Sequence, residues 1–353
     1  MHMQAMVLDA FGGKLRAEIR PIPTPAAGEV LVRVVACGAG LTLESIRLGH
    51  LGGSTPRIMG HEYSGTVAQV GNGVEGWQEG DPVTGSFYLF CGNCVMCASG
   101  REMLCLNNKG NIGAKIDGAF AEYVLVPARN LVRIPAGVVL REAGVIADAV
   151  ATPYHIARER AHIVAGQRVA IIGAGGGVGI HMLQVARAFG AFVIAVERDA
   201  EKLDRLQEFT PDALVDASVD DWQTSLEQAA GGQLDVCIDF VGAPETTSRG
   251  IAALGRGGSF VIAGSMPHLR SDKSAVISAA PMYLVNKELS IVGTRYATRA
   301  EIARSLELVR DGLVKPVIGA SFPLERAEEA LEAIRGNRVF GRILIDCVVE
   351  TQA

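Results

Sequence analysis

Hydrophobic and polar positions follow two different rhythms along the chain. From residue 1 to about residue 145, short apolar stretches change quickly to polar turns. Glu29 to Ala36 (EVLVRVVA) alternates polar and apolar residues, which is typical of a half-buried strand. Turns rich in glycine, asparagine and aspartate follow, such as Gly71-Asn72-Gly73 and Gly80-Asp81-Pro82. This part of the chain is therefore predicted to form short strands that build a small barrel.

Near residue 150 the pattern changes to apolar strands that alternate with helical stretches. Arg168 to Ile172 is a continuous apolar strand, and Phe192 to Val196 is a second one. Between them, apolar residues recur at the spacing of one helix face: Val178, Met182, Val185, Ala186 and Phe189. Further strands are predicted at 236–240 and 259–263, followed by a helix at 300–310 and a final strand at 342–348. Alternating strands and helices indicate an α/β fold with a parallel sheet and right-handed crossovers.

A glycine-rich turn lies between the first of these strands and its helix. The turn consists of Gly173, Ala174, Gly175, Gly176, Gly177, Val178 and Gly179. Glycine lets the backbone approach a pyrophosphate closely, and the N-terminus of the helix offers unpaired N–H groups to it. The spacing Gly173, Gly176, Gly179 fits better than G-x-G-x-x-G, because Val178 stands at the last glycine of that pattern. A purely structural turn is the alternative interpretation.

Glu197, at the end of the second apolar strand, favours a dinucleotide site. An acid in this place can accept hydrogen bonds from both ribose hydroxyls of NAD, and it repels the 2′-phosphate of NADP. Arg198 beside it can soften that repulsion, so NADP stays open. We expect NAD(H) in preference to NADP(H), with these two residues and the glycine-rich turn as the cofactor-binding set.

Composition narrows the class of protein. A chain of 353 residues suggests about two domains, and 49% hydrophobic residues allow buried cores. The net charge is −5 and the basic residues are scattered, which argues against nucleic acid and against an anionic membrane surface as partners. The apolar stretch Val169 to Ile180 is too short to span a bilayer, and the N-terminus lacks the basic start of a signal peptide. We expect a cytoplasmic protein with a small-molecule substrate.

Four of the seven cysteines form a cluster with the spacing Cys91-x2-Cys94-x2-Cys97-x7-Cys105. Four thiolates with no open position are typical of a structural zinc site. The competing interpretation is an iron–sulfur cluster, but its bacterial pattern has a shorter last gap and a proline after the last cysteine, where Leu106 stands here. We therefore expect one structural zinc in this lobe.

The chain resembles the zinc-type alcohol dehydrogenases of the medium-chain dehydrogenase/reductase superfamily. The stretch Gly60-His61-Glu62-x2-Gly65-x5-Gly71-x2-Val74 matches their signature, and the cysteine lobe has the spacing of their structural zinc. The resemblance implies a GroES-like β-barrel catalytic domain at 1–149 and 290–353. It also implies an inserted Rossmann domain, a doubly wound parallel sheet, at 150–289. A homodimer or homotetramer joined through the Rossmann sheets is implied as well.

The resemblance also implies a catalytic zinc, and there this chain departs from the family pattern. Gly40 stands where the family has a cysteine ligand, while Thr42 keeps the hydroxyl of the proton relay. His61 and Asp148 match the other two ligands, and Glu62 matches an alternate ligand. With one ligand lost, we expect this second zinc to be absent, so that His61 and Asp148 form an ordinary hydrogen-bonded pair. Cys37 is expected to be a buried, apolar-like side chain.

Arg342, in Phe340-Gly341-Arg342, matches a family position whose guanidinium approaches the cofactor pyrophosphate. The alternative for Arg342 is a surface arginine on the terminal strand. Without a Lewis acid, the negative charge that develops on the substrate needs other donors, and Thr42, protonated His61, Tyr63 and Tyr154 are candidates.

Three functions follow from this reading. The leading one is an NAD-dependent oxidoreductase of an alcohol/carbonyl pair with a degraded catalytic zinc site. The second is a zinc-independent reductase of a conjugated C=C bond, whose charge is delocalised as the hydride of the nicotinamide arrives. The third is a nucleotide-binding structural or regulatory protein with little turnover.

Overall fold

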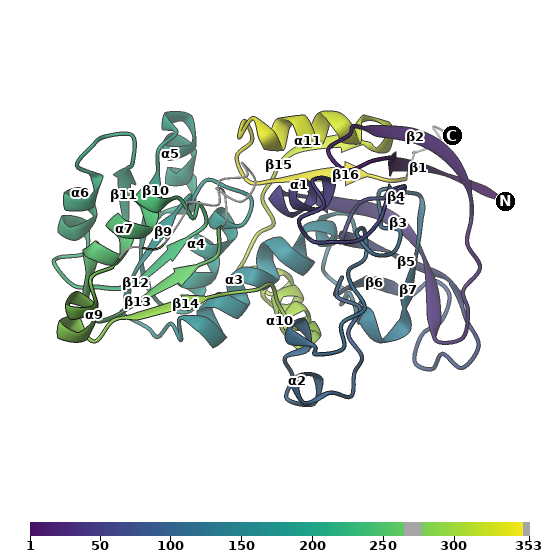
Figure 1. Ribbon diagram of the computed structural model, residues 1–353, viewed down its shortest axis with the longest axis horizontal. Coiled ribbons are helices and arrows are strands. Elements are labelled where there is room, and N and C mark those ends of the chain that lie inside the picture. The colour runs from purple at the N-terminus through teal and green to yellow at the C-terminus, as the bar shows by residue number, and fades with distance from the viewer. Residues whose placement is uncertain (265–276, 278, 349–353) are drawn as a thin grey trace. The chain divides into compact units, whose positions relative to one another are not determined.

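The computed structural model describes residues 1–264, 277 and 279–348 of the chain (Figure 1), which divides into two compact units. Unit 1 comprises Met1–Ala151, Ala297–Gly312 and the chain from Ile318 onward. Unit 2 comprises Thr152–Tyr296 and Leu313–Val317. The first and last parts of the chain therefore fold together, and the middle part forms a unit of its own.

Unit 1 is built on a seven-stranded, mostly antiparallel sheet in the order β15-β16-β3-β5-β6-β8, with β7 pairing with β3. These strands are β3 (Glu29–Ala39), β5 (Glu62–Val70), β6 (Pro82–Gly85), β7 (Tyr123–Pro127), β8 (Leu131–Arg133), β15 (Ile318–Pro323) and β16 (Arg342–Asp346). A smaller sheet has the order β2-β1-β4, with β1 (His2–Leu8), β2 (Leu15–Pro21) and β4 (Arg57–Ile58). The N-terminal and C-terminal parts of the chain are thus joined by hydrogen bonds between β16 and β3.

Strand β3 runs through the core of unit 1, as its alternating sequence predicts. Val30, Val32 and Val34 are fully buried and Arg33 is exposed, while Leu31, on the same face as Arg33, is buried as well. The strand continues three residues beyond the predicted end at Ala36, and it pairs with β5, β7 and β16. The helical segments of unit 1 are α1 (Leu41–Arg47), α2 (Val95–Ala98), η1 (Glu102–Leu104), η2 (Ala128–Asn130), η3 (Glu142–Val145), η4 (Ile146–Val150), α10 (Arg299–Arg310), η7 (Leu324–Arg326) and α11 (Ala327–Arg335).

Unit 2 is a parallel six-stranded sheet in the order β11-β10-β9-β12-β13-β14, the strand order of a Rossmann fold. Its strands are β9 (Arg168–Ile172), β10 (Phe192–Glu197), β11 (Ala213–Asp216), β12 (Leu234–Asp239), β13 (Leu254–Ile262) and β14 (Ser290–Gly293). Its helices are α3 (Ala151–His155), η5 (Ile156–Arg160), α4 (Gly179–Ala188), α5 (Ala200–Leu206), η6 (Gln207–Phe209), α6 (Trp222–Ala229), α7 (Pro244–Ala253) and α9 (Pro281–Lys287). Residues of α6 and α7 pack with β9, β10, β12 and β13 in one buried cluster.

The boundary between the units differs from the sequence-based expectation of 289/290. Strand β14 hydrogen-bonds to β13 in parallel register, so residues 290–296 belong to unit 2. Leu313–Val317 also returns to unit 2, because the backbone N–H of Val317 donates to His181 Nε2 (2.9 Å) and that of Lys315 donates to Gln184 (2.8 Å). Apolar periodicity does not show these two crossings, since both depend on contacts between distant segments.

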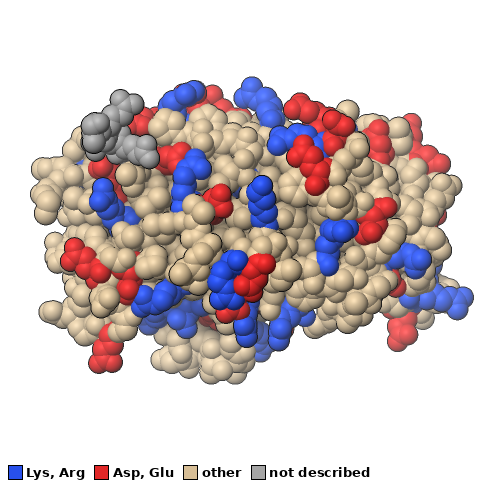
Figure 2. Space-filling model, turned by 180° about the vertical axis from the view of Figure 1, so that it is seen from behind, with Lys and Arg blue, Asp and Glu red and all other residues tan. Residues whose placement is uncertain are grey.

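Two surface properties bear on the classes of partner. Among the described residues, no helix combines the length and hydrophobicity that crossing a membrane requires. On the face shown in Figure 2, basic and acidic side chains are interspersed among neutral ones. That face therefore offers no continuous basic area of the kind that binds phosphate backbones.

Candidate active site

The register of three strands brings together residues that lie far apart in the sequence. Strand β5 pairs with β3 so that Glu62 lies opposite Gly38. Strand β16 pairs with β3 so that Ile343 lies opposite Ala39. Because this pairing is antiparallel, Arg342 at the start of β16 comes next to Gly40, which directly follows β3.

Arg342 holds two carboxylates in a buried ion-pair cluster. Its Nη2 atom donates to Glu62 Oε1 and, at 3.1 Å, to Asp148 Oδ2, which lies on the π-helical turn η4. His61 Nε2 lies 3.6 Å from each of these same two oxygens. None of the four residues is more than 5% exposed. We name Arg342, Glu62, Asp148 and His61 the His61 cluster.

His61 is buried and neutral in this cluster. Neither ring nitrogen makes a hydrogen bond among the described residues, and the ring meets Phe87 edge-on at 4.7 Å between centroids. Burial lowers the pKa of His61 below its ordinary value, although Asp148 acts in the opposite direction. Burial also lowers the pKa of Arg342 to about 10, which leaves the guanidinium protonated at neutral pH. The positive charge of the cluster is therefore carried by Arg342.

The hydroxyl candidates differ in their access to solvent. Thr42 lies in the first turn of α1, two residues after Gly40, and is partly exposed. Tyr63 is fully buried, and burial raises the pKa of its hydroxyl well above the ordinary value. Tyr154 lies on α3 in unit 2, where its hydroxyl contacts Arg158 at 3.5 Å. Within unit 1, Thr42 is thus better placed than Tyr63 to meet a substrate.

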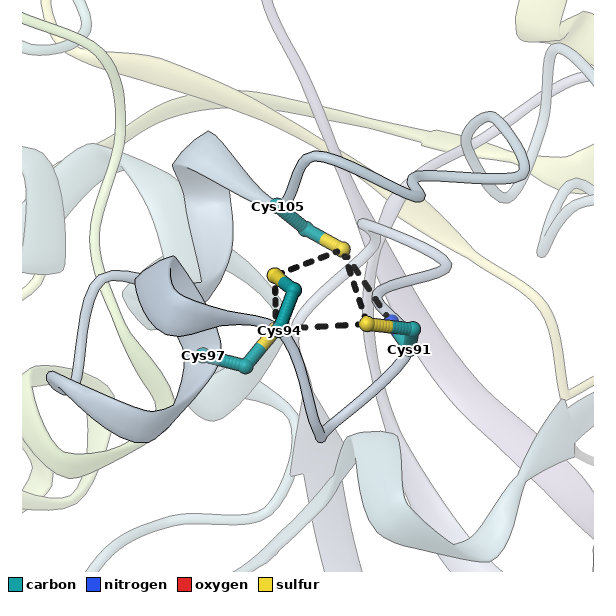
Figure 3. A group of neighbouring side chains, drawn as sticks. All are labelled: Cys91, Cys94, Cys97 and Cys105. Carbon is teal, nitrogen blue, oxygen red and sulfur yellow. Dashed lines mark hydrogen bonds between the residues drawn. The ribbon is translucent and has the colours of Figure 1, made fainter.

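The side chains of Cys91, Cys94, Cys97 and Cys105 converge as the sequence predicts (Figure 3). Their Sγ atoms are 3.5 Å (Cys105–Cys91), 3.6 Å (Cys94–Cys97), 3.8 Å (Cys94–Cys105) and 3.9 Å (Cys91–Cys97) apart. Four sulfurs at 2.3 Å from a tetrahedral zinc would be about 3.8 Å apart. All seven cysteines are free of disulfide bonds. We name these four residues the cysteine lobe.

Backbone N–H groups lower the pKa of two thiols of the cysteine lobe, Cys91 and Cys94, whereas burial raises the pKa of Cys97 to about 12. Backbone N–H groups of Cys97 and Leu106 lower the pKa of the Cys94 thiol, and the N–H of Cys91 donates to Cys105 Sγ at 3.2 Å. Gly92 has φ +84, so the tight turn after Cys91 uses a conformation that other residues rarely adopt. Both features fit a zinc ion, which binds deprotonated sulfur.

The glycine-rich turn of unit 2 has the geometry of a dinucleotide-binding turn. Gly173 has φ +78, and a Cβ on Gly179 would overlap the carbonyl oxygen of Gly173. These two glycines let β9 turn directly into α4, whose N-terminus follows the turn. Gly176 donates to Gly173 O at 3.1 Å, while Gly175, Gly177 and Val178 complete the loop.

Glu197 is held in place by the turn that it faces. Its Oε2 accepts from the N–H of Gly175 (3.1 Å), and its Oε1 accepts from those of Arg198 (2.9 Å) and Asp199 (3.3 Å). Sequence reasoning missed Lys202, which is 5% exposed and lies next to the same turn, where a Cβ on Gly175 would be 2.8 Å from Lys202 Cβ. Its position on α5, beyond an Asp199 that caps the helix, is the signal that could have found it.

Comparison with known proteins places this geometry in a family. The Alcohol dehydrogenase GroES-like domain family matches residues 26–136, and the Zinc-binding dehydrogenase family matches residues 177–311. The acryloyl-coenzyme A reductase of Sulfurisphaera tokodaii is 31% identical over 348 residues, which cover 97% of this chain and 99% of that protein. The NAD-dependent alcohol dehydrogenase of Sulfolobus acidocaldarius is 32% identical over 352 residues, covering 96% and 98%.

The crystal structure of AibC matches with a TM-score of 0.90 and 33% identity, covering 98% of this chain and 96% of that one. The chain belongs to the medium-chain dehydrogenase/reductase superfamily, within its zinc-type alcohol dehydrogenase-like group. It is therefore an oxidoreductase with a GroES-like domain and a Rossmann domain, which confirms the predicted fold class.

The catalytic zinc of a zinc-type dehydrogenase does not fit this site. His61, Glu62 and Asp148 offer three donor atoms within 4.8 Å of one another, but Arg342 already occupies the space among them. Gly40 carries no ligand, and a Cβ built on it would overlap the Arg342 guanidinium. Cys37 does not replace the lost ligand, because it is fully buried in β3 with its Sγ 3.6 Å from Gly38 O. The structural zinc of the family, in contrast, fits the cysteine lobe.

Sequence reasoning did not anticipate the position of Arg342. It was expected either near the cofactor pyrophosphate or on the surface, whereas the structure buries it against Glu62 and Asp148. His61 and Asp148 were expected to be hydrogen-bonded to each other, but His61 Nε2 and Asp148 Oδ2 lie 3.6 Å apart and Asp148 accepts from Arg342 instead. The missing side chain at Gly40 was the signal, because an arginine can enter only where a ligand has been removed.

Proposed function

We propose that this oxidoreductase reduces a C=C bond conjugated to a carbonyl group, such as an enone or an enoyl thioester, with NADH and without a catalytic zinc. The observation that carries the proposal is the guanidinium of Arg342 beside Gly40, among the groups that would otherwise bind the metal. The similarity to an acryloyl-coenzyme A reductase over 97% of the chain supports the same class of reaction.

The chemistry requires no Lewis acid at the oxygen. Held by the glycine-rich turn and Glu197, NADH would supply a hydride to the β-carbon, so that the C=C electron pair would move toward the carbonyl and give an enolate of the substrate. A proton then adds to the α-carbon, so that NADH, a proton and the alkene give NAD⁺ and the saturated product. Because the enolate spreads its charge over three atoms, hydrogen-bond donors stabilise it without a metal ion.

Thr42 is the hydrogen-bond donor that we assign to the substrate carbonyl. It is partly exposed at the start of α1, whereas Tyr63 is buried and His61 is neutral. Asp148 and Glu62 then act as positioning residues, since both accept from Arg342, which lies beside Gly40 at the start of the helix that carries Thr42. His61 lies 3.6 Å from the same two carboxylate oxygens.

The cofactor assigned to the turn of unit 2 is NAD(H). Glu197 faces the turn with both oxygens held by backbone N–H groups, and a fixed carboxylate accepts the ribose hydroxyls and repels a 2′-phosphate. Lys202 lies beside the same turn; burial lowers its pKa, and the charge of Glu197 acts in the opposite direction. Arg198, next to Glu197, would reduce the repulsion of the 2′-phosphate and so weaken the preference for NADH over NADPH. Glu197→Ala should reduce the preference for NADH over NADPH about 10-fold or more, measured as the ratio of kcat/KM values; an unchanged ratio would show that Glu197 does not contact the ribose.

An alcohol/carbonyl reaction is the second candidate. The similarity to an NAD-dependent alcohol dehydrogenase at 32% identity favours it. It requires Thr42 and its neighbours to stabilise a localised alkoxide, which is a harder task without a metal than stabilising an enolate. The homodimer or homotetramer expected from the resemblance stays a prediction.

One experiment separates the two reactions. The purified protein is treated with a mild chelator that leaves the cysteine lobe loaded, and NADH oxidation is followed with matched enones, enoyl thioesters and saturated ketones. With C4-deuterated NADH, we expect deuterium on the β-carbon of a saturated product, with kcat/KM at least 10-fold above that for the ketones. Deuterium on the carbinol carbon would instead establish the alcohol/carbonyl reaction. Thr42→Val should lower kcat about 10²-fold or more, with Ser45→Ala on the same helix as control.

A further inference from the structure

Arg342 and the donor atoms around it have an arrangement that matters for metal binding. Glu62 Oε1 and Asp148 Oδ2 accept from the same atom, Arg342 Nη2, and both lie 3.6 Å from His61 Nε2. Donors bound to one tetrahedral zinc at about 2.0–2.1 Å would be roughly 3.3 Å apart. Two of the three separations are thus close to that value, all three donors lie within 4.8 Å of one another, and the Arg342 nitrogen donates to the two carboxylates.

The charges of the cluster set Arg342 and a metal ion in competition. Two buried carboxylates need a positive partner, and the guanidinium is that partner. A divalent ion would need the same two oxygens, so the ion and Arg342 cannot both bind them. The ring nitrogens of His61 have no hydrogen-bond partner among the described residues. The Nε2 atom, which lies 3.6 Å from both carboxylate oxygens, therefore remains available as a metal ligand.

The ion pair of Arg342 and Glu62 fits only because residues 38 and 40 have no side chain. A Cβ built on Gly40 would overlap three atoms of the Arg342 guanidinium, so any side chain at residue 40 displaces it. Gly38 is needed too, since a Cβ there would lie 2.6 Å from Glu62 Oε2. Gly40 and Arg342 therefore depend on each other, although they are far apart in the sequence.

We infer that Gly40 and Arg342 form a compensating pair that keeps divalent metal ions out of the His61 cluster, and that His61, Glu62 and Asp148 are a latent Zn²⁺ site released when the guanidinium is removed. The inference concerns metal content alone and is tested without any turnover assay. The inference rests on the same Arg342 geometry as the proposed function, so a second zinc in wild type would also remove the metal-free part of that function. Whether a C=C or a C=O bond is reduced is decided separately, by the position of the deuterium in the product.

The test is a zinc titration of the full chain with the cysteine lobe already loaded. Five proteins are compared by elemental analysis after equilibration in buffered Zn²⁺ and by calorimetry: wild type, Arg342→Ser, Arg342→Lys, the double variant Gly40→Cys/Arg342→Ser, and Arg141→Ser. Arg141 is the matched control, because it also pairs with a carboxylate of unit 1, that of Asp346 at 2.6 Å, but lies outside the cluster.

We expect one zinc per chain in wild type, Arg342→Lys and Arg141→Ser, and two in Arg342→Ser. The double variant should bind its second zinc at least 10-fold more tightly than Arg342→Ser, because a thiolate adds a further ligand. If Arg342→Ser becomes stable only when zinc is present, this also supports the inference, since the ion then replaces the lost cation. A second zinc in wild type overturns it whatever the variants do. The inference is also overturned if the Arg342→Ser variant and the double variant are both folded and still bind only one zinc per chain.

Discussion

The cysteine lobe and the His61 cluster both bring potential zinc ligands of unit 1 within contact distance, yet they differ in how their charge is balanced. The lobe has four thiols and no cation among them, with sulfurs 3.5–3.9 Å apart. The His61 cluster has two carboxylates, an imidazole and its own cation, Arg342. The lobe therefore needs an ion to balance its thiolates, whereas the cluster is already neutralised in part. Donor atoms at the right spacing do not by themselves predict a metal site.

Removing a ligand from the lobe should have the largest effect. Cys105→Ser is expected to lower the zinc content from one per chain to none, because a structural zinc needs all four ligands. The lobe should lose on the order of 5 kcal/mol of stability, since zinc binding and folding of such segments are coupled. Limited proteolysis between residues 91 and 105 measures the local loss. Ser99→Ala, exposed in the same lobe, is the control and should change neither quantity.

Removing the cation of the His61 cluster should have the next largest effect. Arg342→Met leaves two buried carboxylates without their partner, which costs about 3–5 kcal/mol of folding free energy. Arg141→Met breaks a pair whose side chains are 42% and 33% exposed, so it should cost about 1 kcal/mol or less. Urea unfolding in the presence of a chelator gives both values. Equal costs would mean that the cluster does not depend on its guanidinium.

Low pH should destabilise the fold mainly at His181, which lies outside both the cysteine lobe and the His61 cluster. His181 donates through Nδ1 to Gly177 O and accepts from Val317 N–H, and burial lowers its pKa to about 4. The unfolded chain therefore binds a proton between about pH 6.5 and 4 that the folded chain does not. The free energy of unfolding should therefore decrease as the pH is lowered from 6.5 to 4, by roughly 3 kcal/mol in total.

The variant His181→Gln isolates this contribution. It should remove most of the slope between pH 6.5 and 4, leaving the part that comes from neutral His61 and from proton competition for the lobe thiolates. Urea unfolding at several pH values measures the slope. An unchanged slope would mean that buried His181 does not resist protonation.

The sequence was sufficient where local pattern determines structure. Alternation in β3, the apolar strands β9 and β10, and the glycine-rich turn all correspond to elements of the structure. The cysteine lobe could be predicted for the same reason, because its four ligands lie within one short segment and converge with little help from the rest of the fold.

The rest depended on contacts between distant segments. Arg342 reaches Glu62 only because β16 and β5 flank β3 in one register, and no periodicity near residue 342 shows this. Strand β14 was assigned to the wrong unit for the same reason, since its membership rests on hydrogen bonds to β13. The loss of a ligand at Gly40 could be read from the sequence, but its replacement by a cation from the other end of the chain could not.

In the His61 cluster, a guanidinium stands where a related dehydrogenase would hold a metal ion. The most direct measurement is anomalous diffraction at the zinc edge from wild-type crystals grown with excess zinc. We expect one anomalous peak per chain, among Cys91, Cys94, Cys97 and Cys105, with Arg342 between Glu62 and Asp148. A second peak bound to His61 Nε2 and Asp148 would contradict this expectation.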